Sequence, residues 1–499
     1  MGLTKWLTVI VLFTIFASFS QVKSADFKRL IQQYKNSKAL ENSQWALLAI
    51  DADNGQIIID HQSKFALAPA SCQKLITTGV ALKLLGADFR FKTQILADGK
   101  ITRDGMLNGN LIIKGNGDPT LGSNIVKGSL PLDSLMLSWL QDIKQKGVRT
   151  ITGNIIADLS LFEPKPVPDD WMWVDLGNYY GASSPALTIH DNLYYLIFRP
   201  GIKEAEPTQI LGTRPVIPGL IFENHVLTGA KGSGDNAYIF CAPGQFKASV
   251  FGTIPAGVDS FKIKGSIPDP ALFAVQRFLT ILMNNGITVK GKAVTTTSPV
   301  PSDNQILLTE SISPPLKDII EQTNKRSINL YCELLVKTLS VVRNGKGNTS
   351  QGLEIIEQTL KEMGVNTNGL HLSDGSGLAP TNAITPRAMV EFLNAMRNET
   401  CFEDYLNSIS LAGDPNDVGY FKKWGLGTPL ARNARIKSGL IEGIRSHSGY
   451  LKDQNGHWII FSFIANHFKG HYTQIDKIHE KLLILLSERF AKGRKNNEN

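Results

Sequence analysis

Ala68-Pro-Ala-Ser-Cys-Gln-Lys-Leu-Ile-Thr-Thr-Gly79 places a serine and a lysine three residues apart, just behind a proline. Pro69 before it, Gly86 after it and the apolar spacing between them predict a helix over residues 67–86. Residues i and i+3 share a helix face, so Ser71 and Lys74 would stand side by side. A serine hydroxyl needs a neighbouring base to become a nucleophile, and a desolvated lysine can serve as that base. The stretch therefore predicts either an ordinary helix surface or a nucleophile with its base.

The two ends of the chain each predict a pair of antiparallel strands. Ser43–Asp60 and Gly449–Ile464 both contain two apolar runs around an Asn-Gly turn, which is a strong β-hairpin signal. Residues 474–490 then have the apolar spacing of a closing amphipathic helix. The simplest arrangement places both hairpins in one sheet.

The middle of the chain has a different pattern. Short runs of Val, Ile and Phe are separated by Gly and Pro, with one helical stretch near 131–147, and this indicates a mainly β region. Residues 304–365 return to helical periodicity. We therefore expect an α+β fold in which residues 25–90 and 300–495 build a domain with an antiparallel sheet flanked by helices. Residues 91–299 would form a large, mostly β insert.

Length and composition fit a globular protein of two or three domains, because 499 residues exceed what a single core normally holds. With 42% hydrophobic and 19% charged residues, the chain resembles neither a disordered nor a polytopic membrane protein. The four cysteines are widely scattered and show neither a disulfide framework nor a metal-binding spacing. We expect no metal, no cofactor and no nucleic-acid partner.

The N-terminus predicts export. Lys5 precedes an apolar run from Trp6 to Phe19, and small residues lead up to Ser24, so residues 1–24 resemble a secretory signal peptide. A membrane anchor is the alternative, but a run of about 14 residues is shorter than the ~20 that a spanning helix needs. The net charge of the whole chain is +8, which suits an anionic cell wall or membrane surface. We expect a periplasmic or otherwise extracytoplasmic protein, whose charge is compatible with peripheral membrane association.

A Ser-x-x-Lys pair is a weak signal alone, because about two matches are expected by chance in a chain of this length. A second match, Ser20–Lys23, indeed lies in the predicted signal peptide. The expected partner motifs of this serine chemistry are Ser-x-Asn and Lys-Thr/Ser-Gly. The only tripeptide of the second kind is Lys437-Ser438-Gly439, in a stretch that would form a strand and present a cation and a hydroxyl to a cleft. The plainer interpretation is a loop with a surface lysine.

Two tripeptides match the Ser-x-Asn motif. Ser302-Asp303-Asn304 is the literal match and lies in a loop. Ser327-Ile328-Asn329 falls where one helical run, 316–323, gives way to another, 330–339. A turn at that junction can aim both side chains into a cleft, so we favour Ser327 and Asn329.

Taken in order, Ser71-Cys-Gln-Lys74, Ser327-Ile-Asn329 and Lys437-Ser-Gly439 resemble the motifs of the penicillin-recognising serine transferases. The long interval between the first two motifs is similar to that of the class C low-molecular-mass penicillin-binding proteins, the D-alanyl-D-alanine carboxypeptidase/endopeptidase family. Other blocks also look like that family: Gly115–Leu121, Asp158–Phe162, Trp171–Tyr180 and Asp374–Leu378. The resemblance covers about residues 43–490. It implies a β-lactamase/transpeptidase-like catalytic domain and two subdomains in the insert.

The resemblance implies a role for each catalytic group. Ser71 would attack the carbonyl of the terminal D-Ala-D-Ala bond and form an acyl-enzyme, and Lys74 would accept its proton. Ser327 would relay a proton to the leaving amine, with Lys437 as its electrostatic neighbour. Peptidoglycan stem peptides would be the substrate, and β-lactam antibiotics would be covalent inhibitors.

The resemblance also implies binding groups. Asn329 would hold the backbone amide of the substrate. Ser438 and Lys437 would bind the carboxylate of the leaving D-Ala, and Gly439, the next residue of the motif, belongs to the same substrate-binding set. The backbone N–H of Leu440 and that of the nucleophile would form the oxyanion hole. Asp158, on the insert, would reach over the cleft to the free amino end of the stem-peptide side chain.

Other interpretations compete with this one. A catalytically inactive, peptidoglycan-binding relative would lack a catalytic group, and none is missing. A β-lactamase would share the motifs, but its first two usually lie closer together. A Ser-His-Asp hydrolase lacks support because no Gly-x-Ser-x-Gly occurs, and His447 is expected to be structural. Trp171, Trp173, Tyr179 and Tyr180 could form a sugar-binding platform, although buried packing is the plainer interpretation.

Overall fold

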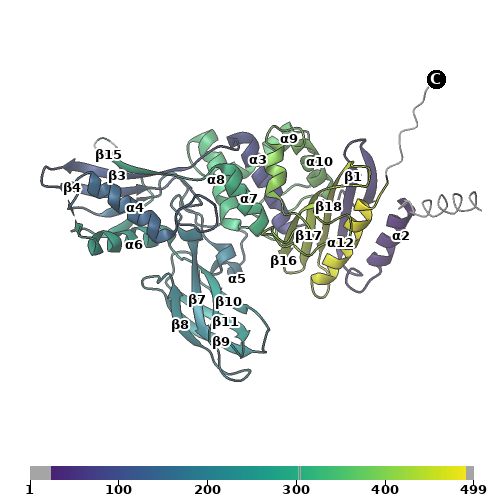
Figure 1. Cartoon of the computed structure of the whole chain (residues 1–499), viewed down its shortest axis with the longest axis horizontal. Coiled ribbons are helices and arrows are strands. Elements are labelled where there is room, and N and C mark those ends of the chain that lie inside the picture. Colours follow the sequence, from purple (N-terminus) through teal and green to yellow (C-terminus); the bar gives the residue numbers. More distant parts are fainter. Residues whose placement is uncertain (1–23, 302, 304, 491–499) are drawn as a thin grey trace, which may run out of the picture.

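The computed structural model describes residues 24–301, 303 and 305–490. The predicted signal peptide, residues 1–24, therefore lies outside the described residues except for its last position. Figure 1 shows an elongated body in which the terminal helices α2 and α12 lie on one side and the insert lies on the other. A smaller lobe projects sideways from the middle of this body.

A five-stranded antiparallel sheet joins the two ends of the chain, in the order β16-β17-β18-β1-β2. Its strands are β1 (Gln44–Asp51), β2 (Gln56–His61), β16 (Arg435–Ile441), β17 (Ile444–Lys452) and β18 (Trp458–Asn466). β1 pairs with β18 from Gln44 opposite Asn466 to Asp51 opposite Ile459. Both predicted hairpins and their shared sheet are confirmed.

Helices cover both faces of this sheet, and β1 therefore buries side chains on both of its sides. Trp45 and Leu47 pack in one core with α2 (Ser24–Lys35) and α12 (Thr473–Ser487), whereas Ala46 and Leu48 pack in the opposite core. Side chains alternate along a strand, so neighbouring residues reach different cores. The opposite core is formed with α3 (Lys74–Leu85), α7 (Leu316–Arg326), α8 (Asn329–Asn344), α9 (Thr349–Glu362), α10 (Pro386–Met396) and α11 (Phe402–Ser408). The predicted α+β class is confirmed.

The insert contains a seven-stranded sheet and two long helices. The strands are β3 (Lys92–Ile101), β4 (Met106–Lys114), β5 (Thr150–Ile151), β6 (Ile155–Asp158), β13 (Thr288–Val289), β14 (Ala293–Thr296) and β15 (Gln305–Ile312). α4 (Leu132–Gln145) and α6 (Pro270–Asn284) bury apolar side chains against the sheet. α4 was predicted, but α6 was missed. Asp269 caps α6 and a proline follows in its first turn, which is a start signal that the sequence already contained.

The expectation of helical periodicity from residue 304 was wrong at its beginning. Gln305–Ile312 forms a strand instead, β15, which pairs with β3 from Gln305 opposite Asp98 to Ile312 opposite Lys92. An edge strand of this length owes its conformation to the partner that satisfies its backbone groups, which local periodicity does not reveal. The insert sheet therefore extends beyond the expected boundary at residue 300. The division of the chain into domains and subdomains otherwise stays a prediction.

The projecting lobe contains two three-stranded sheets. One has β7 (Leu193–Arg199) between β12 (Phe261–Ser266) and β8 (Gln209–Arg214), and the other has β11 (Lys247–Pro255) between β10 (Asn236–Phe240) and β9 (Ile221–Gly229). Short helical turns lead into it: α5 (Trp173–Leu176), η3 (Tyr179–Gly181) and η4 (His190–Asn192). Figure 1 shows α5 where the lobe meets the body.

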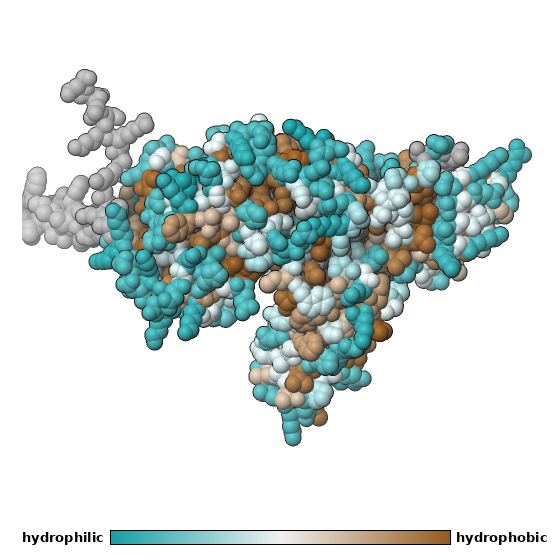
Figure 2. Space-filling view, turned by 180° about the vertical axis from the view of Figure 1, so that it is seen from behind, coloured by the Kyte–Doolittle hydropathy of each residue, from teal (hydrophilic) through white to brown (hydrophobic). Residues whose placement is uncertain are grey.

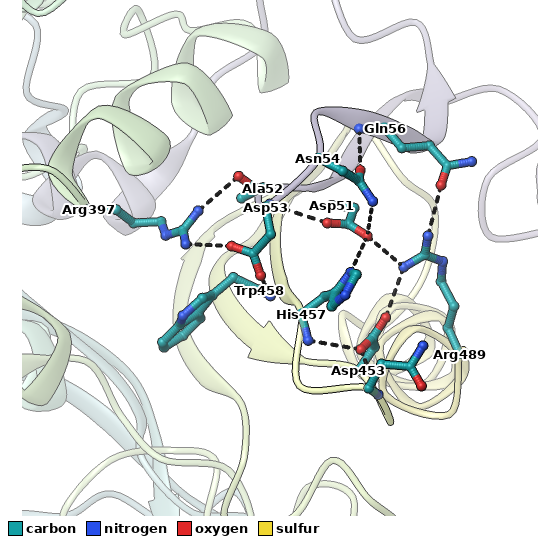
Figure 3. A network of polar contacts seen from close by, with 11 residues as sticks. Asp51, Ala52, Asp53, Asn54, Gln56, Arg397, Asp453, His457, Trp458 and Arg489 are labelled. Atoms are coloured by element: carbon teal, nitrogen blue, oxygen red, sulfur yellow. Dashed lines mark hydrogen bonds and ion pairs between the residues drawn. The ribbon is translucent and has the colours of Figure 1, made fainter. Parts of the chain in front are cut away.

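A buried ion-pair network ties the end of the chain to both hairpin turns (Figure 3). Arg489, which follows α12, lies 3.1 Å from Asp51 and 2.9 Å from Asp453, and the side chains of both acids are fully buried. His457 Nδ1 lies 3.0 Å from Asp51. Two acids and a histidine are the ligand types of a metal site. Arg489 already supplies the positive charge between the carboxylates, so we assign no metal there.

Two further features concern the cysteines and the apolar character of the helices. All four cysteines lie within the described residues and are free thiols. Of the helices in the described part of the chain, none combines the length and the apolar character needed to cross a bilayer.

Candidate active site

The predicted nucleophile lies in a turn that is tighter than expected. Residues 70–73 form a 3₁₀ turn, η2 (Ala70–Gln73), and the α-helix begins only at Lys74. Ala70 has a φ of 44°, a left-handed conformation that is costly for a non-glycine residue and is concentrated at functional sites. The predicted neighbours still meet, because Lys74 Nζ lies 2.8 Å from Ser71 Oγ.

Lys74 is fully buried, and its amine contacts three oxygen atoms. Besides Ser71 Oγ, Nζ lies 2.6 Å from Asn329 Oδ1 and 2.7 Å from the main-chain oxygen of Ser376. A neutral amine has two N–H bonds and one lone pair. If those bonds are donated to Asn329 and Ser376, the lone pair faces the hydroxyl of Ser71.

The charges of the site are poorly solvated. Burial lowers the pKa of Lys74, which favours the neutral amine that a base requires. Burial, and then the charge of Lys74, lowers the pKa of Lys437 to about 7. Glu333 is buried near Lys74, and burial together with the carboxylate of Asp374 raises its pKa to about 8.

Ser327 occupies the turn between α7 and α8 in a left-handed conformation, with φ 59° and ψ 45°. This turn brings its hydroxyl to Lys437, whose Nζ donates to Ser327 Oγ at 2.9 Å. The preferred Ser-x-Asn motif therefore lies beside both lysines. Of the rival tripeptide 302–304, only Asp303 is among the described residues.

Asn329 uses both ends of its side-chain amide. Its Oδ1 accepts from Lys74, and its Nδ2 donates to the main-chain oxygen of Tyr180 at 2.8 Å. Asn329 thereby positions the amine of Lys74 and anchors a turn of the insert to the catalytic domain. Its expected contact with a substrate amide stays a prediction.

Strand β16 approaches the nucleophile closely. A Cβ at Gly439 would lie 2.8 Å from the backbone nitrogen of Ser71, so only glycine fits there. Ile436 N–H points away from β17 and donates to Ser410 O at 2.9 Å. N–H directions alternate along a strand, so the N–H of Leu440 points to the same outer edge. The outer edge of β16, with its outward-pointing N–H groups, therefore lies beside the backbone N–H of Ser71.

A cavity of about 450 Å³ opens beside these groups. Ser327, Asn329, Lys437 and Ser438 line it, and so do Tyr179, Tyr180, Asp191, Lys264 and Tyr420, among others. The wall therefore combines residues of the catalytic domain with residues of the insert and the lobe. Lys74 connects Ser71 to this wall through Asn329.

Several residues singled out from the sequence do not line the cavity: Ser71, Lys74, Gly439, Leu440, Asp158 and His447. Asp158 lies at the end of β6, is 4% exposed and accepts from the backbone nitrogen of Ser160 at 2.9 Å. Its role at the stem peptide stays a prediction. His447 is fully buried on β17, and its Nδ1 lies 2.8 Å from Nδ1 of His479.

Comparison with known proteins decides the family. Residues 28–483 match the D-Ala-D-Ala carboxypeptidase 3 (S13) family. The chain belongs to this family. The S13 protein is 29% identical over 463 residues to a D-alanyl-D-alanine carboxypeptidase of Actinomadura sp. (strain R39). The aligned region covers 91% of this chain and 83% of that protein. The predicted family and the serine-type hydrolase class are confirmed.

A second relative supports both family and fold. The S13 protein is 24% identical over 436 residues to the D-alanyl-D-alanine carboxypeptidase DacB of Haemophilus influenzae, covering 87% of this chain and 88% of that protein. The crystal structure of penicillin binding protein 4 from the same organism matches with a TM-score of 0.78 at 23% identity, covering 92% of this chain and 99% of that chain. The fold is therefore shared with that structure.

Sequence reasoning missed one acid of the S13 site. Glu333 is 1% exposed, and its two carboxyl oxygens accept from Gly375 N at 3.2 and 3.1 Å. The next residue, Ser376, supplies the carbonyl that accepts from Lys74. Glu333 therefore holds the loop that positions the amine of Lys74. The available signal was its place four residues after Asn329, on the same face of α8.

Proposed function

We propose that the protein is a serine D-Ala-D-Ala carboxypeptidase or endopeptidase that cleaves peptidoglycan stem peptides through an acyl-enzyme on Ser71. One observation carries this assignment: the buried amine of Lys74 contacts Ser71 Oγ, Asn329 Oδ1 and Ser376 O, which leaves a neutral amine with its lone pair at the serine. Membership of the S13 family supports the substrate class.

Acylation begins with the transfer of the Ser71 proton to Lys74. Ser71 Oγ attacks the carbonyl carbon of the peptide bond, and the carbonyl oxygen becomes an oxyanion. The backbone N–H groups of Ser71 and Leu440 stabilise that charge. Because burial lowers the pKa of Lys74, its neutral form is easier to reach than that of an exposed lysine.

The tetrahedral intermediate collapses when the leaving amine receives a proton. Ser327 relays the proton from Lys74, and Lys437, 2.9 Å from Ser327 Oγ, keeps the hydroxyl oriented. Lys437 and Ser438 bind the carboxylate of the leaving D-Ala. Water then hydrolyses the ester, which releases the shortened peptide and restores the serine hydroxyl.

β-Lactams would acylate the same serine. The penicillin binding protein 4 of Haemophilus influenzae has been solved in complex with a β-lactam. A β-lactam carries an acyl carbonyl, which Ser71 would attack, and a carboxylate, which Lys437 would bind. The relatives named as carboxypeptidases support extracytoplasmic action on the cell wall. The predicted signal peptide supports export, and the basic net charge supports peripheral association with an anionic membrane or wall.

Covalent labelling tests the proposal. A fluorescent penicillin should label the purified protein at Ser71, as located by intact-mass and peptide mass spectrometry. Ser71→Ala should abolish labelling, whereas Ser138→Ala, a change to a serine of α4 in the insert, should not. Absence of an adduct on the wild type, or an adduct at another residue, would reject the assignment. Digestion of cross-linked muropeptides then separates the two activities, because only an endopeptidase releases monomers.

A further inference from the structure

The outer face of the sheet of β9, β10 and β11 carries a row of aromatic rings. Side chains alternate along these strands, so that Ile239 and Val250 are buried while their neighbours face outward. We call the outward rings the aromatic face: His225, Tyr238, Phe240 and Phe251. Tyr238 and Phe251 are each 46% exposed, so the rings are open to solvent.

These rings form one continuous surface. Phe251 stacks on His225 with centroids 4.7 Å apart and meets Phe240 edge-on at 5.7 Å. Tyr238 stands directly opposite Phe251 in the pairing of β10 with β11. Trp173 of α5, which is 52% exposed, extends the row beyond Phe240 at a centroid distance of 6.1 Å. Figure 2 shows apolar residues reaching the surface of the lobe between polar ones.

The aromatic face continues into the cavity of the active site. Asn178 holds the edge of β10, because its Oδ1 accepts from Ile239 N at 3.1 Å and its Nδ2 donates to Ile239 O at 3.3 Å. The next two residues, Tyr179 and Tyr180, line the cavity, and Tyr179 is 48% exposed. Lys264 Nζ lies 5.0 Å from the centre of the Tyr179 ring and lines the same cavity. A ligand can therefore extend from the catalytic groups to the aromatic face along one surface.

The chemistry of this surface matches a sugar chain. A contiguous exposed apolar patch on a soluble domain commonly marks a binding site. A pyranose ring presents axial C–H groups on its faces and hydroxyl or acetamido groups around its edge, so it can stack on an aromatic ring beside polar side chains. Such side chains flank the rings: Lys247 pairs with Glu223 at 2.5 Å, and Ser249 Oγ donates to Glu223 at 3.2 Å. A purely apolar partner would leave these groups desolvated without replacement bonds.

We propose that the aromatic face binds the amino-sugar chain of peptidoglycan while the attached stem peptide enters the cavity. This inference rests on the proposed function, because a peptidoglycan substrate joins a sugar chain to the cleaved peptide. Tyr238, Phe251 and Trp173 provide the stacking surfaces. Binding the polymer raises the local concentration of stem peptides at Ser71, so the lobe favours polymeric substrate over free peptide. Of the four aromatic residues considered as a platform from the sequence, Trp171 is instead buried, and its Nε1 donates to Asp374 Oδ2 at 2.9 Å.

The test uses the double variant Tyr238→Ser/Phe251→Ser and the matched control Val216→Ser. Val216 is 75% exposed in the same lobe but lies in the loop between β8 and β9, outside the aromatic face. Cosedimentation with peptidoglycan glycan strands stripped of their stem peptides measures binding. We expect the double variant to bind at least about tenfold more weakly than the wild type, and the control to bind like the wild type. Fluorescent-penicillin labelling should be equal in all three proteins.

The outcomes separate the two proposals. Glycan binding by the double variant at wild-type strength, or no glycan binding by a wild type that labels with penicillin, overturns the glycan site alone. Absence of labelling at Ser71 in the wild type overturns the proposed function. If the double variant does not fold, wild type and Trp173→Phe are titrated with oligomers of β-1,4-linked N-acetylglucosamine. The fluorescence response of the wild type should be reduced in Trp173→Phe, and identical responses overturn the glycan site.

Discussion

Replacing Glu333 by glutamine should remove a large part of the pH dependence of folding stability. Burial raises the pKa of Glu333 from 4.5 to about 8 in the folded protein. Between these two values the folded state keeps a proton that the unfolded state has released. The free energy of unfolding of the wild type therefore falls as pH rises from about 4.5 to 8 and levels off above that range.

The magnitude follows from the size of the shift. One pKa unit corresponds to about 1.4 kcal/mol, so the raised pKa of Glu333 costs the wild type on the order of a few kcal/mol between pH 4.5 and 8. Glutamine has nearly the same shape and cannot lose a proton in this way. The variant should therefore gain stability relative to the wild type as pH rises, with most of the gain reached by pH 9.

The assay is urea unfolding followed by circular dichroism at pH 5, 7 and 9. Subtracting the variant from the wild type cancels titrating groups that do not interact with Glu333. Lys437 is one of them, and its lowered pKa makes stability rise between about pH 7 and 10.5. Glu362→Gln, a change to an exposed acid at the end of α9, serves as the control and should show no such trend.

Two results would refute the reasoning. The first is a stability difference between wild type and Glu333→Gln that is the same at pH 5 and pH 9. The second is a large drop in penicillin acylation by Glu333→Gln at pH 7. A Glu333 that is mostly protonated at that pH supplies hydrogen-bond geometry to the Lys74 loop rather than charge, and glutamine preserves much of that geometry.

Three further predictions address the site and the fold. The pKa of Lys437 is about 7, so its positive charge is lost above that pH. The kcat/KM for a carboxylate-bearing substrate should therefore fall by up to about tenfold per pH unit between pH 7.5 and 9. A flat pH profile would contradict this. Asn329→Ala removes one acceptor of Lys74 and should slow penicillin labelling about 10²-fold in stopped-flow measurements, whereas labelling at the wild-type rate would exclude a positioning role. Arg489→Met removes the guanidinium that the buried carboxylates of Asp51 and Asp453 share and should cost about 3–5 kcal/mol in urea unfolding. An unchanged midpoint would show that the network does not stabilise the fold.

Local signals in the sequence were enough for the central sheet and for the choice of the candidate site motifs. The Asn-Gly turns of both hairpins have a preferred backbone geometry that depends on two adjacent residues, so the strands beside them were predictable. The contact between Ser71 and Lys74 was also local, because three residues on a helical turn bring their side chains together. The choice of Ser327 over Ser302 followed from its place between two helical runs.

The tertiary structure decided features that depend on residues far apart in the chain. β15 is a strand because β3 lies beside it. The side-chain amide of Asn329 forms hydrogen bonds with Lys74 and Tyr180, which lie 255 and 149 residues away in the sequence. The aromatic face exists because Tyr238 and Phe251 stand opposite each other on paired strands. The sequence by itself determined which chemical groups are present and their local geometry. Only the folded chain determined which groups lose water and which meet, because burial and strand pairing arise from the packing of distant segments.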